Sequence, residues 1–253
     1  MISFLALDAQ PKKAIVIGAS SGMGRQLAKL LAHEYEVGLV ARRIDLLQSL
    51  QTEIKAKTYI KQMDITADDA QKKLAGFIEE MGGLDLMVIT AGSFMDVGAQ
   101  TTLDAYKTMI DVDATGFVAV AEVAIAQFKH QGYGHLVGFS SIDALRGSAN
   151  YSVYSAVKAF VHTYLEGKRN YMSQNNIPVA VTEIIPGWVN NERIDYTNVP
   201  DTYWVATAED AALQIYDAIK AHTKEAYITK RWRIIAWLMK WLPDCIYNRI
   251  GGL

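Results

Sequence analysis

The stretch that decides the fold is AIVIGASSGMG, residues 14–24. Four apolar residues suited to a buried strand run directly into Gly18, Gly22 and Gly24, spaced G-x-x-x-G-x-G. Glycine lets the backbone turn tightly and approach a ligand closely, and the following helix directs its N–H groups toward the turn. A pyrophosphate is the anion that such a turn binds. The alternative is an ordinary strand-to-helix turn without a ligand, because the commoner spacing is G-x-G-x-x-G.

Short apolar runs alternate with longer amphipathic segments along most of the chain. The runs that we interpret as strands are residues 14–19, 36–42, 59–64, 84–91, 136–141, 179–185 and 226–229. The segments that we interpret as helices are 22–34, a stretch up to about 55, 67–81, 103–130, 151–173 and 208–221. This alternation predicts a doubly wound α/β fold, a parallel sheet of about seven strands with helices on both faces. Functional residues are then expected directly after the strands, where such sheets bind ligands.

The composition is that of one globular domain spanning residues 1–253. Hydrophobic residues make up 51% of the chain and charged residues 21%, which is enough apolar material for a large core. The net charge of −2 disfavours a nucleic-acid binder. The single cysteine, Cys245, excludes an internal disulfide, and no Cys/His cluster has metal-ligand spacing, so no metal is expected. Because we find neither a signal peptide nor a membrane-spanning run, we expect a cytoplasmic protein.

The residues after the second and third predicted strands bear on the choice of dinucleotide. Arg42 and Arg43 stand where an acidic residue would bind the free ribose 2′-hydroxyl. Guanidinium groups match phosphate oxygens bidentately, so we expect NADP(H) in preference to NAD(H). The alternative is a solvated helix start, although cations are unfavourable at a helix N-terminus. Asp64 could accept from the adenine amino group or belong, with Thr66, to the N-terminal cap of the next helix.

Three side chains with complementary acid–base chemistry follow the fifth predicted strand. Ser141 ends that strand, Tyr154 comes thirteen residues later, and Lys158 four residues after Tyr154. Residues i and i+4 share one helix face, so Lys158 is expected beside Tyr154. A phenol has a pKa of about 10, and a neighbouring ammonium group lowers it, which predicts an acid–base group poised closer to neutral pH. Ser141 can donate a hydrogen bond to the same substrate oxygen.

Taken together, these residues resemble the short-chain dehydrogenase/reductase family from Lys13 to about Thr229. Thr90-Ala91-Gly92 is similar to the family's stretch after strand four, and Pro186-Gly187-Trp188-Val189 to its Pro-Gly-x-Val motif at the nicotinamide. The resemblance implies a Rossmann-type fold and hydride transfer between nicotinamide and a carbonyl or secondary alcohol. The residues expected to bind the dinucleotide are Gly18, Ser20, Ser21, Gly22, Met23, Gly24, Arg42, Arg43, Asp64, Ile65, Ala91, Gly92, Tyr154, Lys158, Pro186, Gly187 and Val189.

The sequence departs from the family pattern at several positions. Ile17 replaces a threonine before the glycine turn, and Ile89 and Thr90 replace two asparagines. In the long helix after strand four, Asp113 stands where the family often has a catalytic asparagine that holds a helix kink and a water near the lysine. Asp113 is predicted to be either a variant of this proton relay or part of a structural helix bend. As a carboxylate it would also pair with Lys158 and weaken the effect of that lysine on the phenol.

The segment at 190–206 follows the Pro-Gly motif. The resemblance implies that it is a mobile lid over the substrate, and loops of this length in compact domains are usually functional. It contains Tyr196, Tyr203 and Trp204, and Asn191 replaces a frequent threonine. This mixed aromatic and polar composition does not name a substrate.

The chain ends in a Trp-rich basic segment, residues 230–253. Trp232, Trp237 and Trp241 lie within ten residues of one another, among basic and aliphatic side chains. Residues 224–253 carry six basic residues against two acidic ones. The pattern is typical of a helix at 231–242 that contacts a membrane surface, or of one that packs on a second subunit or covers the active site. The segment also resembles the tails of some bacterial short-chain reductases of lipid-linked or bulky apolar substrates.

These features predict an NADP(H)-dependent oxidoreductase with a small-molecule carbonyl or alcohol substrate. Tyr154 would transfer the proton, Lys158 would tune Tyr154 and bind the nicotinamide ribose, and Ser141 would hold the substrate oxygen. Two alternatives stay open, a non-catalytic NADPH-binding sensor and a peripheral membrane reductase of a lipid-linked substrate. The resemblance implies a homodimer or homotetramer built on the two long helices.

Overall fold

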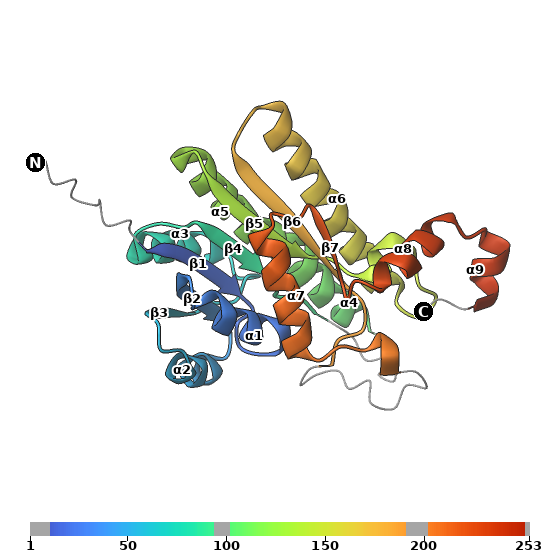
Figure 1. Ribbon diagram of the computed structural model, residues 1–253, viewed down its shortest axis with the longest axis horizontal. Helices are drawn as coiled ribbons and strands as arrows, with labels where there is room; N and C mark the ends of the chain where they lie inside the picture. Colours follow the sequence, from blue (N-terminus) through green and yellow to red (C-terminus); the bar gives the residue numbers. More distant parts are fainter. Residues whose placement is uncertain (1–10, 94–101, 191–201, 251–253) are drawn as a thin grey trace, which may run out of the picture.

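The computed structural model describes residues 11–93, 102–190 and 202–250. Its strands form one parallel sheet in the spatial order β3-β2-β1-β4-β5-β6-β7 (Figure 1). The strands are β1 (Lys12–Ile17), β2 (Tyr35–Ala41), β3 (Thr58–Gln62), β4 (Leu86–Ile89), β5 (Gly134–Phe139), β6 (Val179–Pro186) and β7 (Glu225–Ile228). The chain winds outward from β1 in one direction and then from β4 in the other, which confirms the predicted doubly wound sheet.

Helices cover both faces of the sheet. They are α1 (Gly22–Leu31), α2 (Ile44–Glu53), α3 (Ala70–Met81), α4 (Leu103–Ile110), α5 (Phe117–Gln131), α6 (Ser152–Gln174), α7 (Ala208–Lys220), α8 (Trp232–Trp241) and α9 (Asp244–Ile250). Short helical turns lie at η1 (Asp111–Gly116), η2 (Ile142–Leu145) and η3 (Thr202–Trp204). Helices α1, α2 and α7 pack on one face, and α3, α5 and α6 on the other (Figure 1).

Successive residues of β1 serve the two halves of the core. Ala14 and Val16 pack with α1, α2 and α7, whereas Ile15 and Ile17 pack with α3, α5 and α6. Side chains of a strand point alternately to the two faces, so a strand covered on both sides must be apolar throughout. This explains why the central strands appear in the sequence as continuous apolar runs and not as an alternating pattern.

The predicted long helix at 103–130 contains an irregular turn. The segment η1 is a wider π-helical turn inserted between α4 and α5, and it carries Asp113. Such turns are rare in proteins, and those that occur are often found at functional sites. The departure from the family pattern thus falls on the one part of this helix that is not regular α-helix.

The C-terminal segment forms two helices where the sequence predicted one. Helix α8 ends before Pro243, and α9 follows it. The two helices pack beside η2 around a separate apolar cluster, formed by Ile142, Trp232, Ala236, Met239 and Tyr247. No helix in the described parts of the chain is long and apolar enough to cross a membrane.

Most of the expected lid, including Asn191 and Tyr196, lies outside the described residues. Its described end contains Tyr203 and Trp204, which stack edge to face with ring centroids 5.3 Å apart. Trp204 also contacts Trp232 of α8, with centroids 5.5 Å apart. The end of the lid segment therefore packs on the C-terminal helices.

Candidate active site

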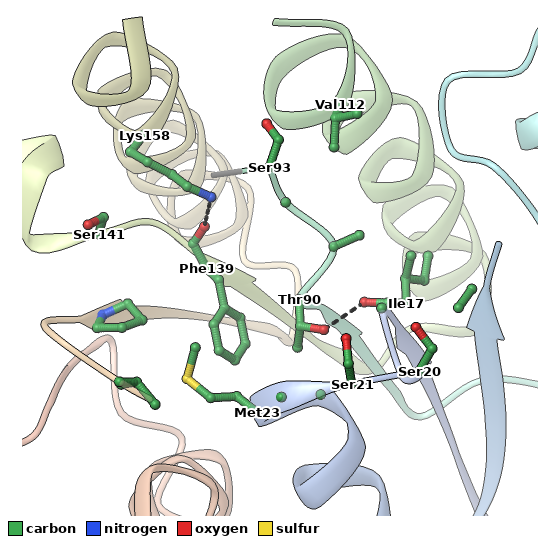
Figure 2. A pocket seen from close by; sticks show the side chains of 18 of the residues that line it. Ile17, Ser20, Ser21, Met23, Thr90, Ser93, Val112, Phe139, Ser141 and Lys158 are labelled. Atoms are coloured by element: carbon green, nitrogen blue, oxygen red, sulfur yellow. Dashed lines mark hydrogen bonds between the residues drawn. The ribbon is translucent and has the colours of Figure 1, made fainter. Parts of the chain in front are cut away.

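A pocket opens at the carboxyl edge of the sheet, between the glycine turn and the start of α6. Figure 2 shows Lys158 and Ser141 toward one side of it and Ser20, Ser21 and Met23 toward another. Every residue nominated from the sequence lines this pocket, except Asp113. Asp113 is buried, with 1% of its surface exposed. It does not line the pocket itself but contacts residues that do.

The glycine turn lies so close to the end of β4 that no side chain would fit. Gly18 has φ +97°, and a Cβ there would lie 2.5 Å from Thr90 Oγ1 and 2.7 Å from the backbone nitrogen of Ala91. Thr90 Oγ1 in turn donates to the Ile17 carbonyl at 3.0 Å (Figure 2). Thr90 occupies a position where the family has an asparagine. Its hydrogen bond joins the ends of β1 and β4 and fixes the glycine turn that leads into α1. Gly22, Met23 and Gly24 of the first turn of α1 line the pocket, so the helix N-terminus faces it as an anion site would require.

The two arginines after β2 have different positions. Arg43 reaches back to the glycine turn and donates to Ser20 Oγ at 3.0 Å and to Ser21 Oγ at 2.8 Å. Arg42 is exposed and lies 3.8 Å from an Asp64 carboxylate oxygen. Both line the pocket, so two guanidinium groups lie close to the end of β2.

Asp64 closes a tight turn after β3. Its Oδ1 accepts from the Thr66 backbone N–H at 3.0 Å and from the Thr66 hydroxyl at 2.8 Å. Burial acts to raise the pKa of Asp64, but the Thr66 bonds and Arg42 outweigh it and lower that pKa. The N-cap position of helix α3 is held by Asp69, without a side-chain cap hydrogen bond, so Asp64 stabilises the turn that precedes this position. Asp64 and Ile65 also line the pocket, which keeps the adenine interpretation open.

The predicted acid–base residues meet at the other side of the pocket. Lys158 Nζ lies 5.7 Å from the centre of the Tyr154 ring, as the i, i+4 spacing predicts. It also donates to the Phe139 carbonyl at 3.4 Å (Figure 2). Ser141 Oγ donates to Asp143 Oδ2 at 3.1 Å, and the Asp143 backbone N–H donates back to Ser141 Oγ at 3.2 Å.

The predicted lowering of the Tyr154 pKa is wrong. Burial raises the pKa of this phenol, and the negative charges of Asp143 and Asp113 add to the effect. The Lys158 ammonium and a side-chain hydrogen bond with Ser141 act in the opposite direction and are outweighed. The sequence argument counted the nearest cation and left out the desolvation that the folded pocket imposes. Tyr154 therefore keeps its proton at neutral pH and is available as a proton donor.

Asp113 forms the pair with Lys158 that its position predicted. Lys158 Nζ donates to Asp113 Oδ1 at 2.7 Å, and the other carboxylate oxygen accepts from the Ser93 backbone N–H at 2.8 Å and from the Ser93 hydroxyl. Burial acts to lower the pKa of Lys158, but Asp113 and Tyr154 outweigh it and raise that pKa. Asp113 thus keeps the lysine charged and joins η1, α6 and the residue after Gly92.

Asp143 is the site residue that reasoning from the sequence missed. Its carboxyl group lines the pocket next to Ser141 and Tyr154, and burial raises its pKa, although the Ser141 hydrogen bond opposes this. A carboxylate there can accept hydrogen bonds from a hydroxyl or ammonium group of a bound molecule. Its position two residues beyond a predicted strand end was the signal that could have found it.

Behind the pocket, Ser140 is held by a second buried carboxylate. Its hydroxyl donates to Glu183 Oε1 at 2.5 Å, and that oxygen lies 2.8 Å from His162 Nδ1. Arg169 Nη2 lies 3.5 Å from the other Glu183 oxygen. Both Ser140 and Ser141 line the pocket, but the Ser140 hydroxyl is bonded to Glu183 of β6.

The family model described as short chain dehydrogenase matches residues 12–198. An uncharacterized oxidoreductase of Myxococcus xanthus is 32% identical over 249 residues, which are 94% of this chain and 95% of that protein. An uncharacterized oxidoreductase of Staphylococcus aureus is 32% identical over 184 residues, 71% of this chain and 78% of that protein.

Solved structures have the same fold at lower identity. The bulky-bulky ketone specific alcohol dehydrogenase from Comamonas testosteroni is similar with a TM-score of 0.75 and 19% identity, over 93% of this chain and 96% of that chain. A short-chain dehydrogenase from Sphingobium yanoikuyae in complex with NADPH is similar with a TM-score of 0.76 and 21% identity, over 92% of this chain and 97% of that chain. These likenesses support the fold.

Proposed function

The chain belongs to the short-chain dehydrogenase family of oxidoreductases, and we propose that it is an NADP(H)-dependent reductase of a small-molecule carbonyl compound. The observation that carries the proposal is the meeting of Tyr154, Lys158 and Ser141 in the pocket that the glycine turn also lines. In that arrangement a proton donor and an anion-binding turn open into the same cavity.

The residues of the pocket fit a dinucleotide. A side chain at Gly18 would collide with the end of β4, and Gly18, Gly22 and Gly24 all line the pocket, so the turn presents its backbone to a ligand there. A Cβ at Gly92 would lie 2.9 Å from Asp113 Oδ1 and 3.1 Å from Lys158 Nζ, so the chain is closely packed beside Lys158 as well. When bound, the cofactor would supply the hydride.

Two arginines support a preference for NADP(H). Arg42 is exposed at the pocket rim, and Arg43 lies against Ser20 and Ser21 of the glycine turn. Their guanidinium groups can bind a 2′-phosphate, whereas neither of the two residues directly after β2 is a carboxylate that could accept from a free ribose hydroxyl. The similar Sphingobium dehydrogenase is a complex with NADPH, which agrees with this preference.

Tyr154 is proposed as the proton donor to the carbonyl oxygen. Its raised pKa keeps the phenol protonated at neutral pH, the form that an acid catalyst needs in the reduction direction. Lys158, held charged by Asp113, stabilises the phenolate that remains after transfer. Ser141 would orient the substrate oxygen, and Asp143, its hydrogen-bond partner, is positioned to accept from a neighbouring substrate group.

For the oligomeric state, we propose a homodimer or homotetramer whose interface is formed by α5 and α6. Exposed aromatic side chains on α6, Phe160 and Tyr171, support it because large apolar groups at a surface favour burial in an interface. Sedimentation velocity tests the state directly, and a monomer at micromolar concentration would contradict it.

The test of the activity is consumption of NADPH with a panel of ketones, aldehydes and keto-sugars, repeated with NADH. We expect turnover with NADPH that exceeds turnover with NADH and falls by about 100-fold or more in Tyr154→Phe, because the phenol supplies the proton. NADPH affinity, measured by fluorescence, should change little in that variant. Turnover that survives Tyr154→Phe would contradict the role of Tyr154.

The second candidate function is an NADPH-binding sensor without turnover. The buried pair of Asp113 with Lys158 favours it, because the carboxylate reduces the net charge that acts on Tyr154. Tight NADPH binding with no turnover on any compound of the panel, and with detergent-dispersed lipidic carbonyls, would favour the sensor over the reductase.

A further inference from the structure

Helix α8 is apolar on two faces. Its inner face buries Trp232, Ala236 and Met239 against Ile142 of η2 and against Trp188. The Trp232 indole N–H also donates to the Trp204 carbonyl at 3.0 Å. These contacts anchor the helix, so its other face is presented by a fixed element of the fold.

The outer face of α8 carries a stripe of large apolar side chains, which we name the outer stripe. They have spacing i, i+3, i+4 and i+7, and their exposed fractions are 65%, 62%, 46% and 74% for Ile234, Trp237, Leu238 and Trp241. Side chains at these spacings share one face of a helix. Single exposed apolar residues are ordinary, but a contiguous group that includes two tryptophans marks an interaction surface.

Exposed cations lie on and near the helix that carries the outer stripe. Lys230, Arg233 and Lys240 are exposed in and just before α8, and Arg249 is exposed in α9. Helix α8 contains no acidic residue. The nearby Asp244 is paired with Arg146, so it does not offset these charges freely. The surface therefore combines exposed aromatic groups with positive charge.

Hydrogen bonds and a cation–ring contact join α8 and α9 to the loop beyond Ser141. Arg146 donates to the Met239 carbonyl at 3.1 Å and to the Leu242 carbonyl, and its guanidinium lies 4.0 Å from the centre of the Tyr247 ring. The Tyr247 hydroxyl donates to the Gly147 carbonyl at 3.0 Å. The orientation of the outer stripe relative to the pocket is thereby set by the folded protein.

We propose that the outer stripe binds the surface of a bilayer that contains anionic phospholipids. Tryptophan prefers the boundary between headgroups and acyl chains, and Arg233 and Lys240 would meet lipid phosphates. A ten-residue helix is about 15 Å long, which suits lying in the interface and not spanning it. A second copy of the chain fits less well, since an isologous contact would bring the same cations together. The proposal goes beyond the reductase function and does not depend on it.

Co-sedimentation of the full-length protein with vesicles tests the proposal. One set of vesicles is pure phosphatidylcholine, and the other is an equimolar mixture with phosphatidylglycerol. We expect binding to the anionic vesicles, weaker binding at high salt, and a loss of about tenfold or more in Trp237→Ser/Trp241→Ser, because both side chains would leave the interface. Arg233→Gln/Lys240→Gln should also weaken binding and make it less sensitive to salt.

A matched control changes two exposed leucines elsewhere. Leu103→Ser/Leu213→Ser removes side chains that are 67% and 52% exposed, and it should leave vesicle binding unchanged. Circular dichroism and NADPH affinity check that each variant is folded. Wild-type protein that stays in the supernatant with anionic vesicles would overturn the proposal. Equal losses in the tryptophan and leucine variants would overturn it too, as would a tryptophan variant that only lowers the oligomeric state in sedimentation velocity.

Discussion

Two buried carboxylates contact side chains of α6 that are one helical turn apart. They differ in the groups that they bind. Asp113, from η1, binds Lys158, whose side chain is itself buried and lines the pocket. Glu183, from β6, binds His162 and Arg169, which keep some contact with solvent, and it anchors Ser140. The same chemical group therefore sets the charge of a pocket lysine in one place and positions a strand end in the other.

The two carboxylates also differ in what would happen to their cationic partners if the carboxylate were removed. If Glu183 were removed, His162 could release its proton and Arg169 would keep Glu225, 3.5 Å away. If Asp113 were removed, Lys158 would be left charged in a buried position with only the Phe139 carbonyl and the Tyr154 ring beside it among the contacts described. The cost of a lost partner depends on whether the remaining charge can reach water or another partner.

The largest effect is expected for the free energy of unfolding. Asp113→Ala should cost about 3–5 kcal/mol, because it leaves a buried charge uncompensated. Glu183→Ala should cost less, about 1–3 kcal/mol, because its cations can be rehydrated. Urea unfolding of both variants checks the order, and a Glu183→Ala variant that loses as much stability as Asp113→Ala would break the comparison.

The next effect concerns the pH dependence of carbonyl reduction. Asp113 raises the pKa of Tyr154, so Asp113→Asn should lower that pKa and move the alkaline limb of the kcat/KM profile to lower pH. Glu183→Gln is the matched control and should leave the limb in place. An unchanged profile in Asp113→Asn would remove the relay role, and a shift to higher pH would mean that Lys158 had lost its proton.

The smallest effect is a pH dependence of stability that belongs to the Glu183 cluster. The hydrogen bond and charge of Glu183 raise the pKa of His162 against burial. This stabilisation is fully present below the unfolded pKa of about 6.5 and is lost as pH rises through the folded pKa, by at most about 1.4 kcal/mol per pH unit. His162→Gln should flatten the change in unfolding free energy between pH 6 and pH 9.

His135, which is more deeply buried than His162, shows the opposite shift and serves as the comparison. Burial lowers the pKa of His135 to about 3, and its Nε2 lies 2.8 Å from the Thr182 hydroxyl. A depressed histidine pKa destabilises the fold only below about pH 6.5, so His135 does not contribute above that pH. Parallel slopes for wild type and His162→Gln between pH 6 and pH 9 would show that the Glu183 cluster carries no such linkage.

Local patterns in the sequence were enough for the fold and for much of the candidate site. Apolar runs located the strands, since a sheet covered on both faces demands them. The glycine turn and the i, i+4 spacing of Tyr154 and Lys158 follow from backbone geometry, so they could be predicted from neighbouring residues alone. The pairing of Asp113 with Lys158 was predicted through a family resemblance, which already contains tertiary information.

Only the tertiary structure decided properties that depend on burial and on residues far apart in the chain. It raised the pKa of Tyr154 where the sequence predicted a lower one, because the effect of burial on the phenol outweighs the charge of Lys158. It brought Arg43 onto Ser20 and Ser21, and Arg146 onto α8 across more than ninety residues. Periodicity acts within one helix or strand, whereas desolvation and long-range charge pairs exist only after the elements have packed together.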